Sequence, residues 1–239
     1  MKTHCIFESR LLFDFKSGIV FYQIALERRA MIWSPNSRKY IVESAMHYQW
    51  SEFVFVVGFL AYLAIRGVYI EKTKRNEARI RNVDWMERVA MFLVFVGNLL
   101  LPIVYLLTPW LAFADYRLPT VAGLFGSLLI AIAVWLFWRS HADLGLNWSV
   151  TLEIREGHRL VERGVYRLMR HPMYAAILLF GVAQGLLLHN WFAGWTALAT
   201  FILLIIIRTP REEKMLRDAF PEEYQKYAQR TWRLIPKIF

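Results

Sequence analysis

The chain has 239 residues, of which 57% are hydrophobic and 20% are charged, and its formal net charge at pH 7 is +10. This hydrophobic fraction exceeds that of an ordinary soluble domain, so the composition predicts an integral membrane protein. The basic residues are spread over several loops without a nucleic-acid-binding motif, so we expect membrane lipids rather than nucleic acid as partners. A single cysteine excludes an internal disulfide, and the six scattered histidines lack metal-ligand spacing, so we expect no metal site.

The first part of the chain, residues 1–51, is predicted to be an N-terminal extension. Its most apolar run, 11–26, is interrupted by Asp14 and Lys16, and it lacks the hydrophobic region of a signal peptide. As an alternative to Met1, Met46 is therefore considered as the start of the native protein. Residues 52–239 are predicted to form one membrane domain.

Five apolar runs are predicted to cross the membrane, because each approaches the length that spans about 30 Å of hydrocarbon. They are residues 53–70, 89–108, 120–138, 173–188 and 191–207. Only His189 and Asn190 separate the last two, which predicts a tight antiparallel hairpin. In the second run, Asn98 precedes Pro102. We expect the Asn98 amide to hydrogen-bond to backbone groups of a helix kinked at this proline. The predicted fold class is an all-α polytopic membrane protein with about five transmembrane helices.

The lysines and arginines are concentrated on one side of this topology. They follow the first, third and fifth spans, whereas the two opposite loops carry Arg117 alone. The positive-inside rule therefore places the basic side in the cytoplasm and the N-terminal end of the first span outside.

Polar residues gather in two segments, 141–171 and 208–239, which flank the predicted hairpin. Because both ends of a hairpin lie on one membrane side, we expect His171 and Arg208 to approach within one helix-pair separation, about 8–10 Å between axes. Pro172 suits the first turn of a helix and would place His171 at its N-cap. An ordinary interfacial loop, with arginines on lipid phosphates and tyrosines in an aromatic belt, is the structural alternative.

The C-terminal segment is predicted to form a cytoplasmic amphipathic helix that covers this site. We expect it to begin near Pro210, with Glu212 and Glu213 in its first turn. Its apolar face would consist of Leu216, Phe220, Tyr224 and Tyr227.

Three sequence elements occur in a characteristic order: EGHRLVERGVYRLMRHPMY (156–174), then the short apolar hairpin, then RTPREEKML followed by FPEEYQKY. This set resembles the membrane methyltransferases of the isoprenylcysteine carboxyl methyltransferase and phospholipid N-methyltransferase group, and is closest to the bacterial relatives of the isoprenylcysteine enzyme. The resemblance implies S-adenosyl-L-methionine as cofactor and a lipophilic acceptor from the bilayer, such as the carboxylate of an isoprenylcysteine-like molecule. It also implies a bacterial inner-membrane location with the active site facing the cytoplasm.

The same resemblance assigns roles to individual residues. The cofactor-binding residues that it implies are His158, Arg159, Leu160, Val161, Tyr166, His171, Pro172, Met173, Tyr174 and Glu212. Arg208 matches an arginine that would hold the acceptor's carboxylate during catalysis. In the loop 141–153, upstream of the cofactor-binding residues, Asn147 and Trp148 are predicted to face the acceptor. Thr151 departs from the family pattern, because the eukaryotic enzymes have a cofactor-contacting glutamine there.

Other functions remain open from the sequence. A related enzyme could methylate a phospholipid amine or a thiol. A sterol-type reductase would need a pocket for the 2′-phosphate of NADPH. A non-catalytic membrane protein would need neither S-adenosyl-L-methionine nor NADPH. The nucleotide that co-purifies with the protein separates these classes.

Overall fold

The computed structural model describes residues 38–73, 78–81, 84–145, 148, 153–155 and 160–235. Most of the predicted N-terminal extension therefore lies outside the described residues. The membrane helices are α2 (Arg38–Thr73), α3 (Trp85–Phe95), the π-helix η2 (Val96–Leu100), α4 (Leu101–Leu107), α5 (Thr120–Leu144), α6 (Pro172–Leu188) and α7 (Trp191–Ala219). The shorter elements are β1 (Ala78–Arg81), η3 (Ala112–Ala114), β2 (Glu153–Arg155), η5 (Gly164–Arg167) and α8 (Pro221–Arg230).

The predicted spans are all helical. Among the described residues, four helices are long and apolar enough to cross a membrane: Trp50–Thr73, Trp85–Leu107, Thr120–Leu144 and Trp191–Ala219. The remaining predicted span, α6, is a shorter apolar helix of 17 residues, about 25 Å long at 1.5 Å per residue. The all-α membrane prediction is therefore confirmed, with four full-length spans and one short helix.

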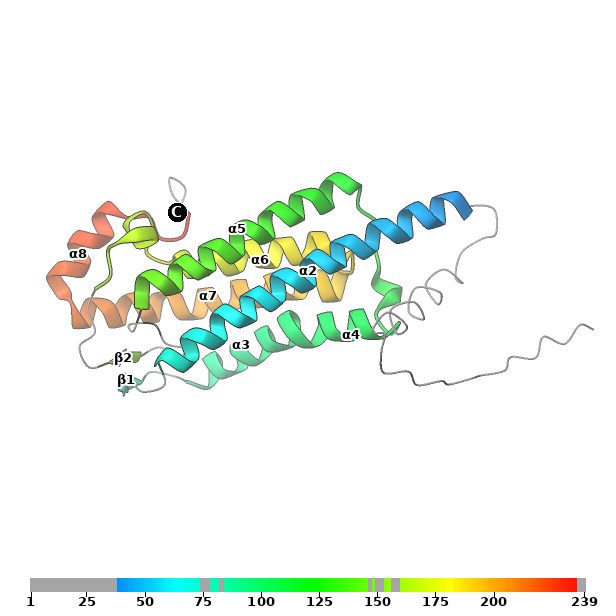
Figure 1. Cartoon of the computed structure of the whole chain (residues 1–239). Coiled ribbons are helices and arrows are strands. Elements are labelled where there is room, and N and C mark those ends of the chain that lie inside the picture. Colours follow the sequence, from blue (N-terminus) through cyan, green and yellow to red (C-terminus); the bar gives the residue numbers. More distant parts are fainter. Residues whose placement is uncertain are drawn as a thin grey trace, which may run out of the picture.

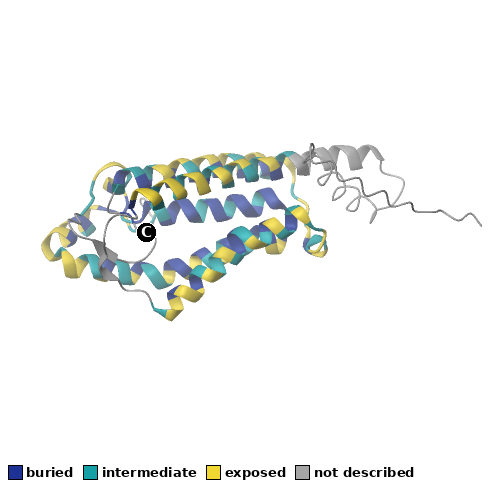
Figure 2. Cartoon of the chain, turned by 60° about the horizontal axis from the view of Figure 1, so that its bottom comes forward, coloured by how far each residue is buried: buried dark blue, intermediate teal, exposed yellow. Residues whose placement is uncertain are grey.

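The helices run along one common direction, and the polar loops and α8 lie together at one end (Figure 1). Helix α6 packs against α2, α5 and α7, and most of its residues are buried. Residues that are exposed lie mainly on the outer faces of the bundle (Figure 2). This pattern explains why a short helix is tolerated: its neighbours cover it instead of lipid.

Glycines on α6 bring it close to α7. A Cβ atom added at Gly181 would lie 2.9 Å from Leu198 Cα, and one at Gly185 would lie 2.7 Å from the Trp195 ring. Small residues at such contacts allow membrane helices to approach closely and gain van der Waals contact.

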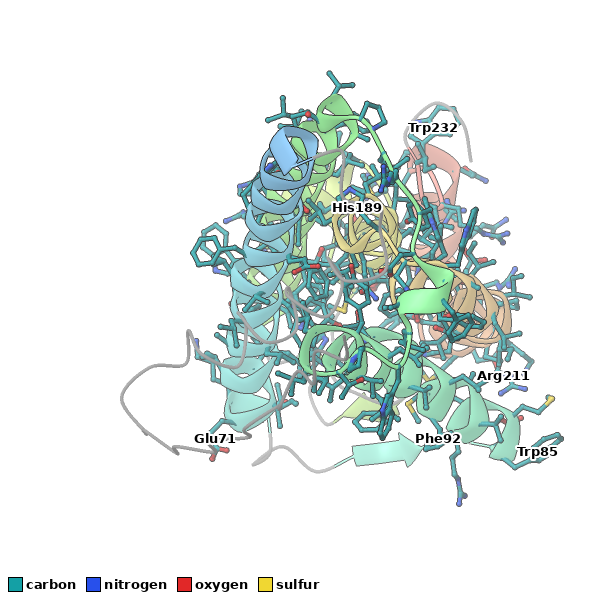
Figure 3. The ribbon with its side chains drawn as sticks, turned by 90° about the vertical axis from the view of Figure 1, so that its right-hand side faces the viewer. Glu71, Trp85, Phe92, His189, Arg211 and Trp232 are labelled. Atoms are coloured by element: carbon teal, nitrogen blue, oxygen red, sulfur yellow. The ribbon has the colours of Figure 1, made fainter. Side chains whose placement is uncertain are left out.

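The predicted hairpin between α6 and α7 is confirmed. His189 ends α6 in the left-handed conformation with φ of 49°, which reverses the chain. The Asn190 side chain then caps α7 by accepting hydrogen bonds from the backbone N–H groups of Phe192 and Ala193, each at 3.0 Å. Its amide also donates to Leu111 O at 2.7 Å, which ties the turn to the neighbouring loop. Figure 3 shows His189 at the centre of this end of the bundle.

The prediction that a new helix begins near Pro210 is wrong. Helix α7 continues through Pro210 to Ala219, and the chain bends only at Phe220 before α8 begins. A proline inside a helix removes one backbone hydrogen bond, but ion pairs made by the following residues hold this stretch in place. Glu212 and Glu213 therefore lie well inside a helix, and the dipole argument for their position does not apply.

The structure also contains a two-stranded antiparallel sheet, which the sequence did not predict. Strands β1 and β2 come from the loops after α2 and α5, and they join these loops at the polar end of the bundle.

Candidate functional site

A cavity of about 440 Å³ lies between the helices and extends to the polar end of the bundle. One part is apolar, and its walls come from α2, α3, η2, α5, α6 and α7: Phe59, Tyr62, Leu63, Val94, Phe95, Leu99, Phe137, Ile177, Phe201 and Leu204. The other part carries polar groups: Arg66, Tyr166, Arg170, His171, Tyr174, Arg208, Glu212 and Tyr227. The cavity therefore combines a polar end with an apolar chamber that reaches into the membrane region.

Most of the predicted site residues line this one cavity, although they come from separate segments. They are Trp148, Leu160, Val161, Tyr166, His171, Met173, Tyr174, Arg208 and Glu212. Pro172 is not among the lining residues, but it begins α6 as predicted, with His171 at the N-cap. His158, Arg159, Asn147 and Thr151 lie outside the described residues.

The His171 side chain does not cap α6, although His171 occupies the N-cap position. Its ring stacks on Tyr174 with centroids 5.3 Å apart, and its Nε2 lies 3.3 Å from Glu213 Oε1. The imidazole is thus oriented by contacts on two sides, and Tyr174 beside it also lines the cavity.

Two adjacent glutamates on α7 have different surroundings, because successive helix residues point about 100° apart. Glu212 lines the cavity, its side chain is 30% exposed, and its Oε2 accepts a hydrogen bond from the Tyr174 hydroxyl at 2.5 Å. Glu213 is only 5% exposed. It accepts hydrogen bonds from Arg233, at 3.0 Å from Nε and 2.6 Å from Nη2, and from Arg170 Nε at 3.3 Å. Glu212 is therefore available to a ligand, whereas Glu213 holds the structure together.

The C-terminal segment covers the polar end of the cavity. Backbone N–H groups of Arg170 and His171 donate to Trp232 O at 2.8 Å and Arg233 O at 3.0 Å. On α8, the Tyr227 hydroxyl donates to Tyr166 O at 2.7 Å. These bonds place α8 against the loop before α6, as the sequence predicted.

Arg208 faces the cavity and also has a carboxylate partner that the sequence did not indicate. Its Nε lies 3.4 Å from Glu87 Oε1, and Glu87, in the first turn of α3, is completely buried. One turn earlier, Asp84 caps α3 and binds Arg211 through two oxygens, each 2.7 Å from a guanidinium nitrogen. These hydrogen bonds from Arg211 lower the pKa of Asp84 below its usual value.

Figure 3 shows Trp85 and Arg211 on the same side of the molecule, at this junction of α3 with α7. The spacing of Asp84 and Glu87 ahead of an apolar run is a helix-start signal that could have identified the first turn of α3.

A tight turn positions the loop that carries Tyr166. Gly164 adopts φ of +58°, and a Cβ atom there would overlap the Asp143 carboxylate, so only glycine fits. Asp143 accepts a hydrogen bond from Val165 N at 2.9 Å and pairs with Arg139 at 2.8 Å. Burial raises the pKa of Tyr166 well above its usual value, so its hydroxyl stays protonated at neutral pH.

The arrangement suits an elongated ligand, or two ligands meeting end to end, with polar groups near Arg208 and Glu212 and an apolar portion between the spans. Within the described part of the chain, no group of three His, Cys, Asp or Glu side chains could hold a metal ion.

Comparison with known proteins relates this region to one family. The sequence model of the isoprenylcysteine carboxyl methyltransferase family matches residues 124–218. A probable protein-S-isoprenylcysteine O-methyltransferase of Oryza sativa subsp. indica is 36% identical over 91 residues, which cover 37% of this chain and 47% of the relative. Protein-S-isoprenylcysteine O-methyltransferase B of Arabidopsis thaliana is 31% identical over 116 residues, which cover 48% of this chain and 59% of the relative.

The human protein-S-isoprenylcysteine O-methyltransferase is 32% identical over 97 residues, covering 41% of this chain and 34% of the relative. The chain thus spans about half the length of the first curated relatives that it matches. The matched region includes α6 and most of α7, and therefore His171, Tyr174, Arg208 and Glu212.

Proposed function

We propose that the protein is a membrane methyltransferase, because residues 124–218 match the sequence model of the isoprenylcysteine carboxyl methyltransferase family. Its methyl donor is S-adenosyl-L-methionine. Its acceptor is the carboxylate of a lipophilic molecule similar to isoprenylcysteine, which enters from the bilayer.

One observation carries the proposal: a single cavity joins the polar residues of the family-matched region to an apolar chamber between the spans. A lipophilic carboxylate needs both environments at once. Its chain would lie among Phe59, Phe95 and Phe201, while its charged end would reach Arg208.

The residues at the polar end suit the proposed methyl donor. Tyr166, Tyr174 and Tyr227 offer aromatic faces that can hold a purine ring or lie near a cation. Glu212 offers a partly exposed carboxylate to hydroxyl or amino groups, oriented by the hydrogen bond from Tyr174. Leu160, Val161 and Met173 supply apolar walls beside them.

When bound, S-adenosyl-L-methionine supplies an electrophilic methyl group and a neutral leaving group, so a carboxylate acceptor that is already ionised needs no general base. The protein then contributes position and exclusion of water. Arg208 would orient the acceptor's carboxylate through its guanidinium group. Glu87, 3.4 Å away, shares that charge and keeps Arg208 from binding the acceptor so tightly that the ground state is favoured.

The distribution of charge supports a proposal for which side of the membrane the polar end of the cavity faces. Arg66, Arg170 and Arg208 all lie at the end of the bundle that carries the basic loops. We propose that this end faces the cytoplasm, where S-adenosyl-L-methionine is present, and that the protein resides in the inner membrane of a bacterium.

The test is a methyl-transfer screen with radiolabelled S-adenosyl-L-methionine in membranes that contain the full chain. The acceptors are prenylcysteine, a fatty acid, phosphatidylethanolamine and a small thiol, with membranes lacking the protein as control. We expect label in prenylcysteine as a base-labile methyl ester. Label in phosphatidylethanolamine or the thiol would reassign the acceptor, and co-purified NADP without methyl transfer would favour the reductase.

Amine methylation has one supporting observation. An amine must lose a proton before or during the reaction, and the partly exposed Glu212 carboxylate could accept it. A dependence of phosphatidylethanolamine methylation on Glu212, with prenylcysteine left unlabelled, would establish this second function.

A further inference from the structure

The second membrane-spanning segment contains a local irregularity beside the cavity. Between α3 and α4, residues Val96–Leu100 form a π-helix, and the backbone N–H of Leu101 donates to Val96 O. Pro102, near the start of α4, has no N–H to donate to the preceding turn. Single-turn π-helices of this kind occur frequently at functional sites.

Other residues anchor this irregular turn, and Asn98 takes no part. Gln184 of α6 donates from Nε2 to Gly97 O at 3.0 Å and to Ala193 O at 2.6 Å, which joins η2, α6 and α7. Gly97 packs directly on the backbone of α7. The expectation that the Asn98 amide satisfies a kinked helix is therefore wrong.

Asn98 has no hydrogen-bond partner among the residues that the structure describes. The residue is only 7% exposed, and its side-chain Oδ1 is buried without a partner. An amide in apolar surroundings is costly unless it is paired, and polar residues inside membrane spans usually serve a function. Asn98 also lines the cavity.

The position of Asn98 is deep in the apolar chamber. A Cβ atom at neighbouring Gly97 would lie 3.0 Å from both Thr196 C and Ala197 N, so Asn98 lies level with this part of α7. Arg208 follows Ala197 by three helical turns, about 16 Å along the helix axis. An acceptor whose carboxylate lies at Arg208 therefore presents the middle or far part of its chain to Asn98.

We propose that Asn98 selects the acceptor by hydrogen bonding to a polar group within its chain. The amide can both accept and donate, so the matching group is one that does the same, a hydroxyl or a secondary amide. The acceptor is then a functionalised amphiphile instead of a plain hydrocarbon chain. This inference rests on the proposed function only in placing the acceptor's carboxylate at Arg208.

The test measures binding, so it does not depend on methyl transfer. Purified full-length protein in nanodiscs is titrated calorimetrically with a series of fatty acids in which one hydroxyl moves along the chain, with the plain fatty acid as reference. We expect one hydroxyl position to bind about five- to tenfold more tightly than the plain acid. Asn98→Leu should abolish this preference while binding the plain acid at least as well.

Thr200→Val is the matched control, because it removes a hydroxyl at similar depth on α7 whose hydrogen bonds to described residues go to Thr196 O and Ala197 O of its own helix. It should keep the preference. A wild-type protein that binds no hydroxylated acid more tightly than the plain one would overturn the inference, as would a preference that survives in Asn98→Leu. If Asn98→Leu fails to fold, the wild-type series alone still decides.

The two proposals fail separately. A hydroxyl preference that depends on Asn98, without methyl transfer to any acceptor, would leave the inference standing and reject the proposed function. Methyl transfer to plain prenylcysteine without any hydroxyl preference would do the reverse.

Discussion

Replacing Glu213 by alanine should destabilise the protein strongly, because this carboxylate is the common partner of three basic side chains. Arg170, His171 and Arg233 each approach it within 3.3 Å, and its own side chain is 5% exposed. Removing one partner of a buried ionic group costs about 3–5 kcal/mol. Arg233 is 39% exposed and partly screened by water, so we expect the lower end, about 3 kcal/mol. For a chain of this size that corresponds to a fall in Tm of roughly 10 °C.

The assay is thermal unfolding of the purified protein in detergent, followed by tryptophan fluorescence. The control is Glu222→Ala on α8, a glutamate that is exposed. It should change Tm by no more than about 2 °C. A Glu213→Ala protein as stable as this control would refute the assignment of Glu213 as the residue that holds the C-terminal segment in place.

Three further changes test the site and its loop. Glu212→Ala should weaken binding of S-adenosyl-L-methionine about tenfold or more in calorimetry, because a charged hydrogen bond is lost; near-wild-type affinity would remove Glu212 from the cofactor site. Arg208→Lys should reduce turnover of a carboxylate acceptor steeply with little change in cofactor affinity, because lysine lacks the planar fork; preserved turnover would make Arg208 a membrane anchor. Gly164→Ala should lower the free energy of unfolding by about 1–3 kcal/mol, through strain at φ of +58° and contact with Asp143; unchanged Tm would mean that the turn relaxes freely.

The sequence alone determined the membrane character of the chain, the helical spans and the basic end. These features depend on local properties: the length of an apolar run, the position of Pro172 at a helix start, and a two-residue link at His189 and Asn190. Each follows from the physical chemistry of a short stretch, so neighbouring residues suffice to predict it. The hairpin also predicted that His171 and Arg208 lie at the same end of the molecule, because its two helices return the chain to the side from which it entered.

Only the tertiary structure decided which polar groups meet. Glu212 and Glu213 are chemically identical neighbours, yet one faces the cavity and the other a basic cluster, because helix rotation and packing set their directions. Glu87 lies far from Arg208 in sequence, and only the packing of α3 on α7 pairs them. The Asn98 amide was expected to hydrogen-bond to backbone groups of its own kinked helix. Instead, Gln184 donates to the Gly97 carbonyl, and the Asn98 side chain lines the cavity with its Oδ1 unpaired. Such pairings depend on contacts between segments remote in sequence, which no local pattern encodes.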